Sequence, residues 1–178
     1  MSYPSEGGLT AHRINLNSNP NCFTQDKERA INNWMKHCWK YVKIHSNIKK
    51  SEADVILREM AELVFQAQDD KPLFQFDMKS TGLPTSWNRP QDGDKDYIRY
   101  EVGHIHPQLE GGESNPENLT FQSARCNQHI QSSLDIDEVM EYFQDNEVVI
   151  QRMNSIKELH NSSHWNYLKS QLKLNPQV

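Results

Sequence analysis

Cysteines are few in this sequence and lie far apart. The chain holds three, Cys22, Cys38 and Cys126, and no two of them form a CxxC pair. An odd and widely spaced set is not typical of a disulfide framework, and a structural zinc knuckle needs closely spaced thiolate pairs. The sequence therefore predicts a protein that works in a reducing compartment.

Long hydrophobic runs are also missing. No stretch approaches the roughly 20 apolar residues that a membrane span requires. The polar N-terminus, MSYPSEGGLTAHR, lacks the apolar core of a signal peptide. We therefore expect a cytoplasmic protein without a membrane partner.

The sequence also lacks an excess of positive charge. The 19 Lys and Arg residues are outnumbered by 24 Asp and Glu residues, which gives a formal net charge of −5. An indiscriminate nucleic-acid binder would usually be basic. A protein that gathers its basic side chains on one face remains compatible with this balance.

Two helices are predicted after an irregular N-terminal arm at residues 1–23. From about Asp26 to Ile44, one apolar stripe recurs at helical spacing, and it consists of Ile31, Trp34, Cys38, Tyr41 and Val42. A second helix is expected to begin at Ser51, which forms a capping-box-like pair with Asp54, and to end before Pro72. Its expected buried face consists of Ile56, Met60, Leu63 and Val64. The two helices should form an antiparallel hairpin.

A long loop at residues 80–96 follows a short predicted strand at residues 73–79. Loops of this length in small domains are more often functional than idle. Lys79, Trp87 and Arg89 could contact phosphates or bases, although a surface loop pinned by one Trp explains them equally well. Residues 24–96 are thus a helical hairpin plus a loop, and a candidate DNA-recognition region.

Polar side chains gather in a predicted strand, turn, strand and helix at residues 97–134. The first strand covers residues 97–102, and the second begins at Leu119 and leads into a helix near Ser123. The glycine pair Gly111-Gly112 permits the chain to fold back on itself. Four polar residues would then converge, namely His104, Asn118, Asn127 and His129. Helices should fill residues 135–178, with Met153, Ile156, Trp165, Leu168 and Leu172 among their apolar positions.

This central segment resembles the motif of the HNH (ββα-metal) endonuclease family, which includes restriction-type and phage-encoded members. Four pieces carry the resemblance in order: Gly103-His104-Ile105-His106-Pro107, Gly111-Gly112, Asn118-Leu119 and Cys126-Asn127. The intervals of 14 residues from His104 to Asn118, and of 9 residues from Asn118 to Asn127, fit the family pattern. About 30 of the 178 residues are covered.

The resemblance implies a fold, an activity and a set of roles. The fold would be α+β, a mostly helical chain that carries a small central ββα-metal motif. His104 would be the general base that deprotonates the attacking water, and Asn118 would hold the turn and orient His104. Asn127 would bind a divalent metal, Mg²⁺ or Mn²⁺, because both prefer oxygen ligands. The substrate would be DNA, in the cytoplasm of a bacterial or phage-infected cell.

One departure from the family pattern concerns the metal. The family usually has Asp before the catalytic His, whereas this chain has Gly103, which offers no side-chain ligand. Glu101 on the same strand could reach the metal instead, and His129 or His106 are alternative substitutes. The second hypothesis is accordingly a DNA-binding or interaction protein with a degenerate HNH scaffold.

Further DNA contacts are expected around the motif. Arg99 and Arg125 flank it and join Lys79, Trp87 and Arg89 as candidate DNA-binding residues. The residues outside the motif would give a sequence-specific, restriction-type enzyme the surface that it needs to read bases. A homodimer would suit a palindromic site.

Overall fold

A computed structural model describes residues 27–73, 100–123, 138 and 147–176. Within these ranges the chain is mostly helical, with four α-helices longer than two turns and one two-stranded antiparallel sheet. The expected α+β class is therefore confirmed at this level. In the part of the chain that the structure covers, no helix is both long and apolar enough to cross a membrane.

The first two helices, α3 (Lys27–His45) and α4 (Lys50–Ala67), form the expected antiparallel hairpin. Lys27 at the beginning of α3 pairs with Asp70 just after α4, at 2.6 Å, so the distant ends of the two helices meet. Four residues of the apolar stripe predicted for α3 are buried, namely Ile31, Trp34, Cys38 and Val42, whereas Tyr41 is only partly buried.

The predicted beginning and buried face of α4 need correction. The helix begins at Lys50 after Lys49, without a side-chain cap, and Ser51 lies inside the first turn. Asp54 pairs with Lys50 at 2.6 Å rather than serving a capping box. The buried face is centred on Leu57, Met60 and Val64, while Ile56 and Leu63 pack at its margins.

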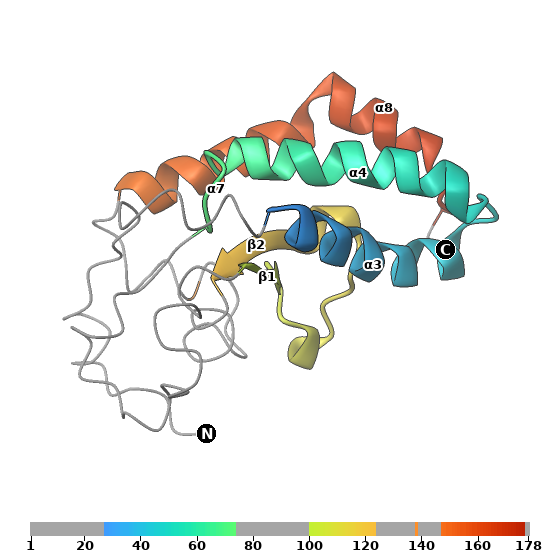
Figure 1. Cartoon of the computed structure of the whole chain (residues 1–178), viewed down its shortest axis with the longest axis horizontal. Helices are drawn as coiled ribbons and strands as arrows, with labels where there is room; N and C mark the ends of the chain where they lie inside the picture. Colours follow the sequence, from blue (N-terminus) through green and yellow to red (C-terminus); the bar gives the residue numbers. More distant parts are fainter. Residues whose placement is uncertain (1–26, 74–99, 124–137, 139–146, 177–178) are drawn as a thin grey trace.

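The C-terminal helices, α7 (Glu147–Asn161) and α8 (Ser163–Gln171), cover α4 on the side away from α3 (Figure 1). Ser162 separates them and caps α8, because its hydroxyl accepts a hydrogen bond from the N–H of Trp165. The expected apolar positions are buried: Met153, Ile156, Trp165, Leu168 and Leu172.

The β-hairpin consists of β1 (Tyr100–His104) and β2 (Leu119–Ser123) and packs against α3 and α4. Val102 lies opposite Phe121, and His104 lies opposite Leu119. Both expected strands are present, although β1 extends two residues beyond the predicted end. The strand predicted at residues 73–79, the loop at 80–96 and the helix after Ser123 lie almost wholly outside the described residues.

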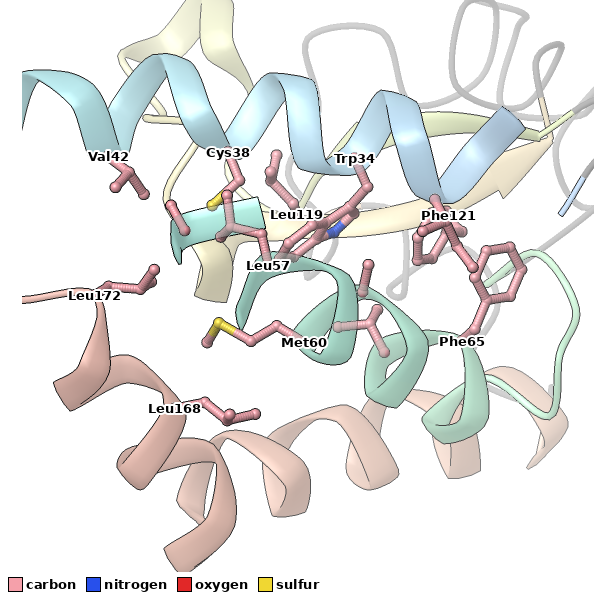
Figure 2. Packing of buried hydrophobic residues seen from close by; sticks show 14 of the residues in the cluster. Trp34, Cys38, Val42, Leu57, Met60, Phe65, Leu119, Phe121, Leu168 and Leu172 are labelled. Atoms are coloured by element: carbon pink, nitrogen blue, oxygen red, sulfur yellow. The ribbon is translucent and has the colours of Figure 1, made fainter. Parts of the chain in front are cut away.

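The hydrophobic core lies where the hairpin meets the helices (Figure 2). Trp34 of α3 and Leu57 of α4 are fully buried beside Leu119 of β2. Phe65 of α4 stacks on Phe121 with ring centroids 3.8 Å apart. Apolar burial therefore presses β2 onto both helices at once.

The backbone of Phe121 is also held by a side chain from α4. Gln68 is fully buried; its Oε1 accepts from the Phe121 N–H at 3.0 Å, and its Nε2 donates to the Phe121 carbonyl at 2.8 Å. The N–H of Leu73 donates to the same carbonyl at 2.8 Å. The outer edge of β2 is thus hydrogen-bonded to the segment at and after the end of α4.

We predict that Gln68→Leu lowers the free energy of unfolding by about 1–3 kcal/mol, because the buried N–H of Phe121 loses its acceptor. Urea denaturation followed by circular dichroism measures this change. Gln66→Leu is the matched control on the exposed side of α4 and should change stability by less than about 0.5 kcal/mol. Equal stability of the two variants would contradict the assigned role of Gln68.

Candidate functional site

The loop between β1 and β2 is folded tightly by its two glycines. Gly111 ends the 3-10 turn η2 (Gln108–Glu110) with φ of +91°, a conformation that disfavours other residues. A side chain at Gly112 would overlap the carbonyl groups of His106 and Pro107. The expected role of this pair in folding back the chain therefore has a clear structural basis.

Asn118 ties the two ends of this loop together. It ends the 3-10 turn η3 (Pro116–Asn118), and its Oδ1 accepts from the N–H of His106 at 2.7 Å. Its Nδ2 donates to the carbonyls of His106 and Glu113, at 3.0 and 2.8 Å. Its own carbonyl accepts from the N–H of Ile105 at 2.9 Å. The chain that directly follows His104 is consequently held in one path.

His104 stands at the last position of β1 and is partly buried. Its Nε2 lies 3.0 Å from the hydroxyl oxygen of Ser114, which orients the ring. The imidazole of His37 from α3 approaches it edge-on, with ring centroids 6.3 Å apart. Two effects together lower the pKa of His104 to about 4: burial, which is the larger, and the charge of the neighbouring His37. At neutral pH His104 is a neutral imidazole that can accept a proton.

His104 opens onto a cavity of about 360 Å³ between the hairpin and α3. The hairpin contributes Glu101, Val102, His104 and Gln108 to its wall, and α3 contributes Arg29, Asn33 and His37. Arg29 fixes this arrangement, because its guanidinium donates to the carbonyl of Tyr100 at 2.7 Å. The cavity therefore unites a carboxylate and two imidazoles from two separate elements.

Sequence reasoning missed the three residues of α3. They recur at a spacing of four, which places them along one flank of the helix. Their spacing is visible in the sequence, but the apolar stripe on the same helix predicts only core packing. Burial lowers the pKa of His37, and Lys40 and Lys36 lower it further, whereas Glu101 opposes them.

The packing around Gly103 leaves no room for a side chain at this position. The side chain of Gln122, which is fully buried, occupies the space that a Cβ at position 103 would take. The hydroxyl of Thr120 donates to the Gly103 carbonyl at 3.2 Å across the two strands. Position 103 is therefore closed to a side chain as long as Gln122 keeps this position.

The structure brings together only part of the predicted site. Glu101 and His104 share the cavity, whereas His106 is exposed, with Nε2 3.1 Å from the Glu110 carbonyl. Within the described ranges, no group of three or more His, Cys, Asp or Glu side chains is arranged to hold a metal ion. Seven predicted residues lie outside the described part: Lys79, Trp87, Arg89, Arg99, Arg125, Asn127 and His129.

Comparisons with protein-family models, with curated proteins and with solved structures found no match to this chain.

We predict that His104 titrates near pH 4 in the folded, metal-free protein, as followed by NMR of its imidazole. In the unfolded chain its pKa should be about 6.5, so the unfolded state takes up the proton first as the pH falls. Stability should drop as the pH falls from about 6.5 to about 4, because the folded state takes up this proton at lower pH than the unfolded state does. His104→Gln should remove that part of the drop; titration of folded His104 near 6.5 would contradict the assignment.

Proposed function

We propose that the protein is a metal-dependent DNA endonuclease with an HNH-type site, which hydrolyses phosphodiester bonds. One observation carries the proposal: a neutral histidine at the end of β1 shares a cavity with Glu101, behind a loop that Asn118 holds. A neutral imidazole can remove a proton from water, whereas a protonated one cannot. The order and spacing of the motif in the sequence add independent support.

His104 is the general base in this proposal. It accepts a proton from the water that attacks the scissile phosphate, and Ser114 keeps its ring oriented. Asn118 acts as a positioning residue, because its hydrogen bonds fix the backbone of His106 rather than reach the cavity wall.

The proposed cation would bind at the cavity, where Glu101 is the described carboxylate. Glu101 and His104 both line the cavity, and the Glu101 carboxylate lies close enough to His37 to counter the lowering of its pKa by burial. Glu101 would hold the ion together with Asn127 and His129, the ligands that the sequence resemblance implies. A bound Mg²⁺ or Mn²⁺ supplies positive charge that stabilises the phosphate and the leaving oxygen. Glu101 would thus replace the ligand that Gly103 cannot provide.

The remaining parts of the proposal concern the substrate. Arg99, Arg125, Lys79, Trp87 and Arg89 are proposed to contact DNA. Cleavage at a defined sequence by a homodimer, as in restriction-type enzymes, completes the proposal, because a two-fold dimer matches a palindromic site.

One observation favours a second candidate function. The Gln122 side chain closes position 103, so the ligand that the resembled family carries there has no place in this packing. A hairpin of this kind without a metal would be a DNA-binding or interaction module. The two functions differ in whether a bound ion and His104 are needed for cleavage.

We predict that the protein cuts plasmid DNA with Mg²⁺ or Mn²⁺ but not with EDTA. Loss of the general base in His104→Ala should lower the cleavage rate on the order of 10²–10⁴-fold. His164→Ala is the matched control, because His164 is exposed and pairs with Glu59 on α4 outside the cavity. Gel electrophoresis of the products measures the rates, and discrete bands would reveal site specificity. Failure to cut with any of these ions would favour the binding module.

We predict that Glu101→Gln weakens Mn²⁺ binding at least about tenfold, because a carboxylate ligand is lost. Isothermal titration calorimetry without DNA measures this affinity directly. Glu110→Gln makes the same charge change on the exposed loop and should bind Mn²⁺ as the wild type does. Equal affinities for the two variants would remove Glu101 from the ligand set.

A further inference from the structure

Charge is divided sharply between the two elements that build the cavity. The segment from Tyr100 to Ser123 carries four Glu residues and no Lys or Arg, so its formal charge is −4. In contrast, α3 carries a single acidic residue, Glu28, against five basic ones, which gives +4: Lys27, Arg29, Lys36, Lys40 and Lys43. Of the described helices and strands, α3 has the largest excess of positive charge and could attract a polyanion to this cavity.

The basic side chains of α3 differ in what they already contact. Lys27 is paired with Asp70, and Arg29 donates to the Tyr100 carbonyl. Lys36 and Lys40 are exposed, and among the residues that the structure describes no carboxylate lies within 4.0 Å of their ammonium groups. Other lysines of the fold, such as Lys50 and Lys169, do have a carboxylate partner at that range.

Lys36 and Lys40 also stand beside the cavity. They lie one helical turn apart, about 6 Å along the axis, and His37 between them in sequence lines the cavity wall. Their charges reach this wall, because both lower the pKa of His37. The exposed basic row of α3 therefore runs next to the cavity that contains His104.

We infer that α3 is the element that binds the DNA backbone, with Lys36 and Lys40 contacting phosphates of a duplex that lies across the cavity containing His104. Asn33 and His37 then face the scissile phosphate, which is attacked by the water that His104 deprotonates. This inference rests on the proposed nuclease function and adds a phosphate-binding surface on an element outside the β-hairpin. An acidic protein partner on the same lysines is the competing occupant, and the experiment below separates the two.

The test compares Lys36→Gln/Lys40→Gln with the wild type in binding a short fluorescein-labelled duplex. Fluorescence anisotropy in EDTA, at about 50 to 200 mM salt, measures the affinity without a metal ion or cleavage. Loss of two phosphate contacts should weaken binding on the order of tenfold and reduce the slope of log K against log salt by about 1.8.

Lys49→Gln/Lys157→Gln is the matched control. Both lysines are exposed, and this variant makes the same charge change on α7 and at the beginning of α4, away from the cavity. It should keep the wild-type slope, with an affinity change below about twofold. Thermal melting of both variants shows that each is folded.

Two outcomes overturn the inference: a Lys36/Lys40 variant that binds DNA with the wild-type affinity and slope, or a control variant that loses as much. If wild type still cuts DNA in a metal-dependent way, the nuclease proposal stands without α3. If the wild type binds DNA through these lysines but none of the divalent ions supports cleavage, the DNA-binding role of α3 stands and the nuclease proposal fails. Absence of any DNA binding by the wild type overturns the inference that α3 binds DNA. An acidic protein would then be the favoured partner of these lysines.

Discussion

The paired hydrogen bonds between Gln68 and the backbone of Phe121 determine how the β-hairpin sits on the helices. A two-stranded sheet has no third strand to satisfy its outer edge, and a lone hairpin is marginally stable in water. Here a buried amide takes the place of a neighbouring strand at one residue, while Phe121 stacks on Phe65 beside it. Hydrogen bonds to the backbone and apolar packing of the side chain thus both act on Phe121. Together they fix the position and the rotation of β2.

The position of β2 determines the candidate site, because the pairing register between the two strands fixes where each residue of β1 lies. Val102 pairs with Phe121 and His104 with Leu119, so the docking of β2 brings His104 to the flank of α3. Arg29 then hydrogen-bonds the Tyr100 carbonyl and fixes the other end of β1. A cavity between two elements that are more than fifty residues apart in sequence depends on these few contacts.

Much of the local structure was predictable, whereas the partners of each element were not. The stripe of Trp34 and Cys38 predicted α3, and apolar alternation predicted both strands, because periodicity reports which face is buried. The loop glycines were also readable, since few residues accept the backbone of Gly111. The contact between His37 and His104 could not be predicted from the sequence, because it depends on how the β-hairpin packs against α3. Gln68 gave no signal either: a single amide at the end of an amphipathic helix looks the same whether it is solvated or buried.

The two halves of the cavity have complementary charge, because the hairpin is acidic and α3 is basic. The hairpin carries the proton acceptor and a carboxylate, but its formal charge of −4 would repel a phosphate. The helix carries the cationic side chains but no carboxylate on the cavity wall. Gln122 occupies the space beside Gly103, so position 103 adds no side chain to the half that the hairpin contributes. Under the proposed function, a cation bound at Glu101 and the lysines of α3 would act on the same phosphate from two sides, and an acidic chain could then hold a polyanionic substrate.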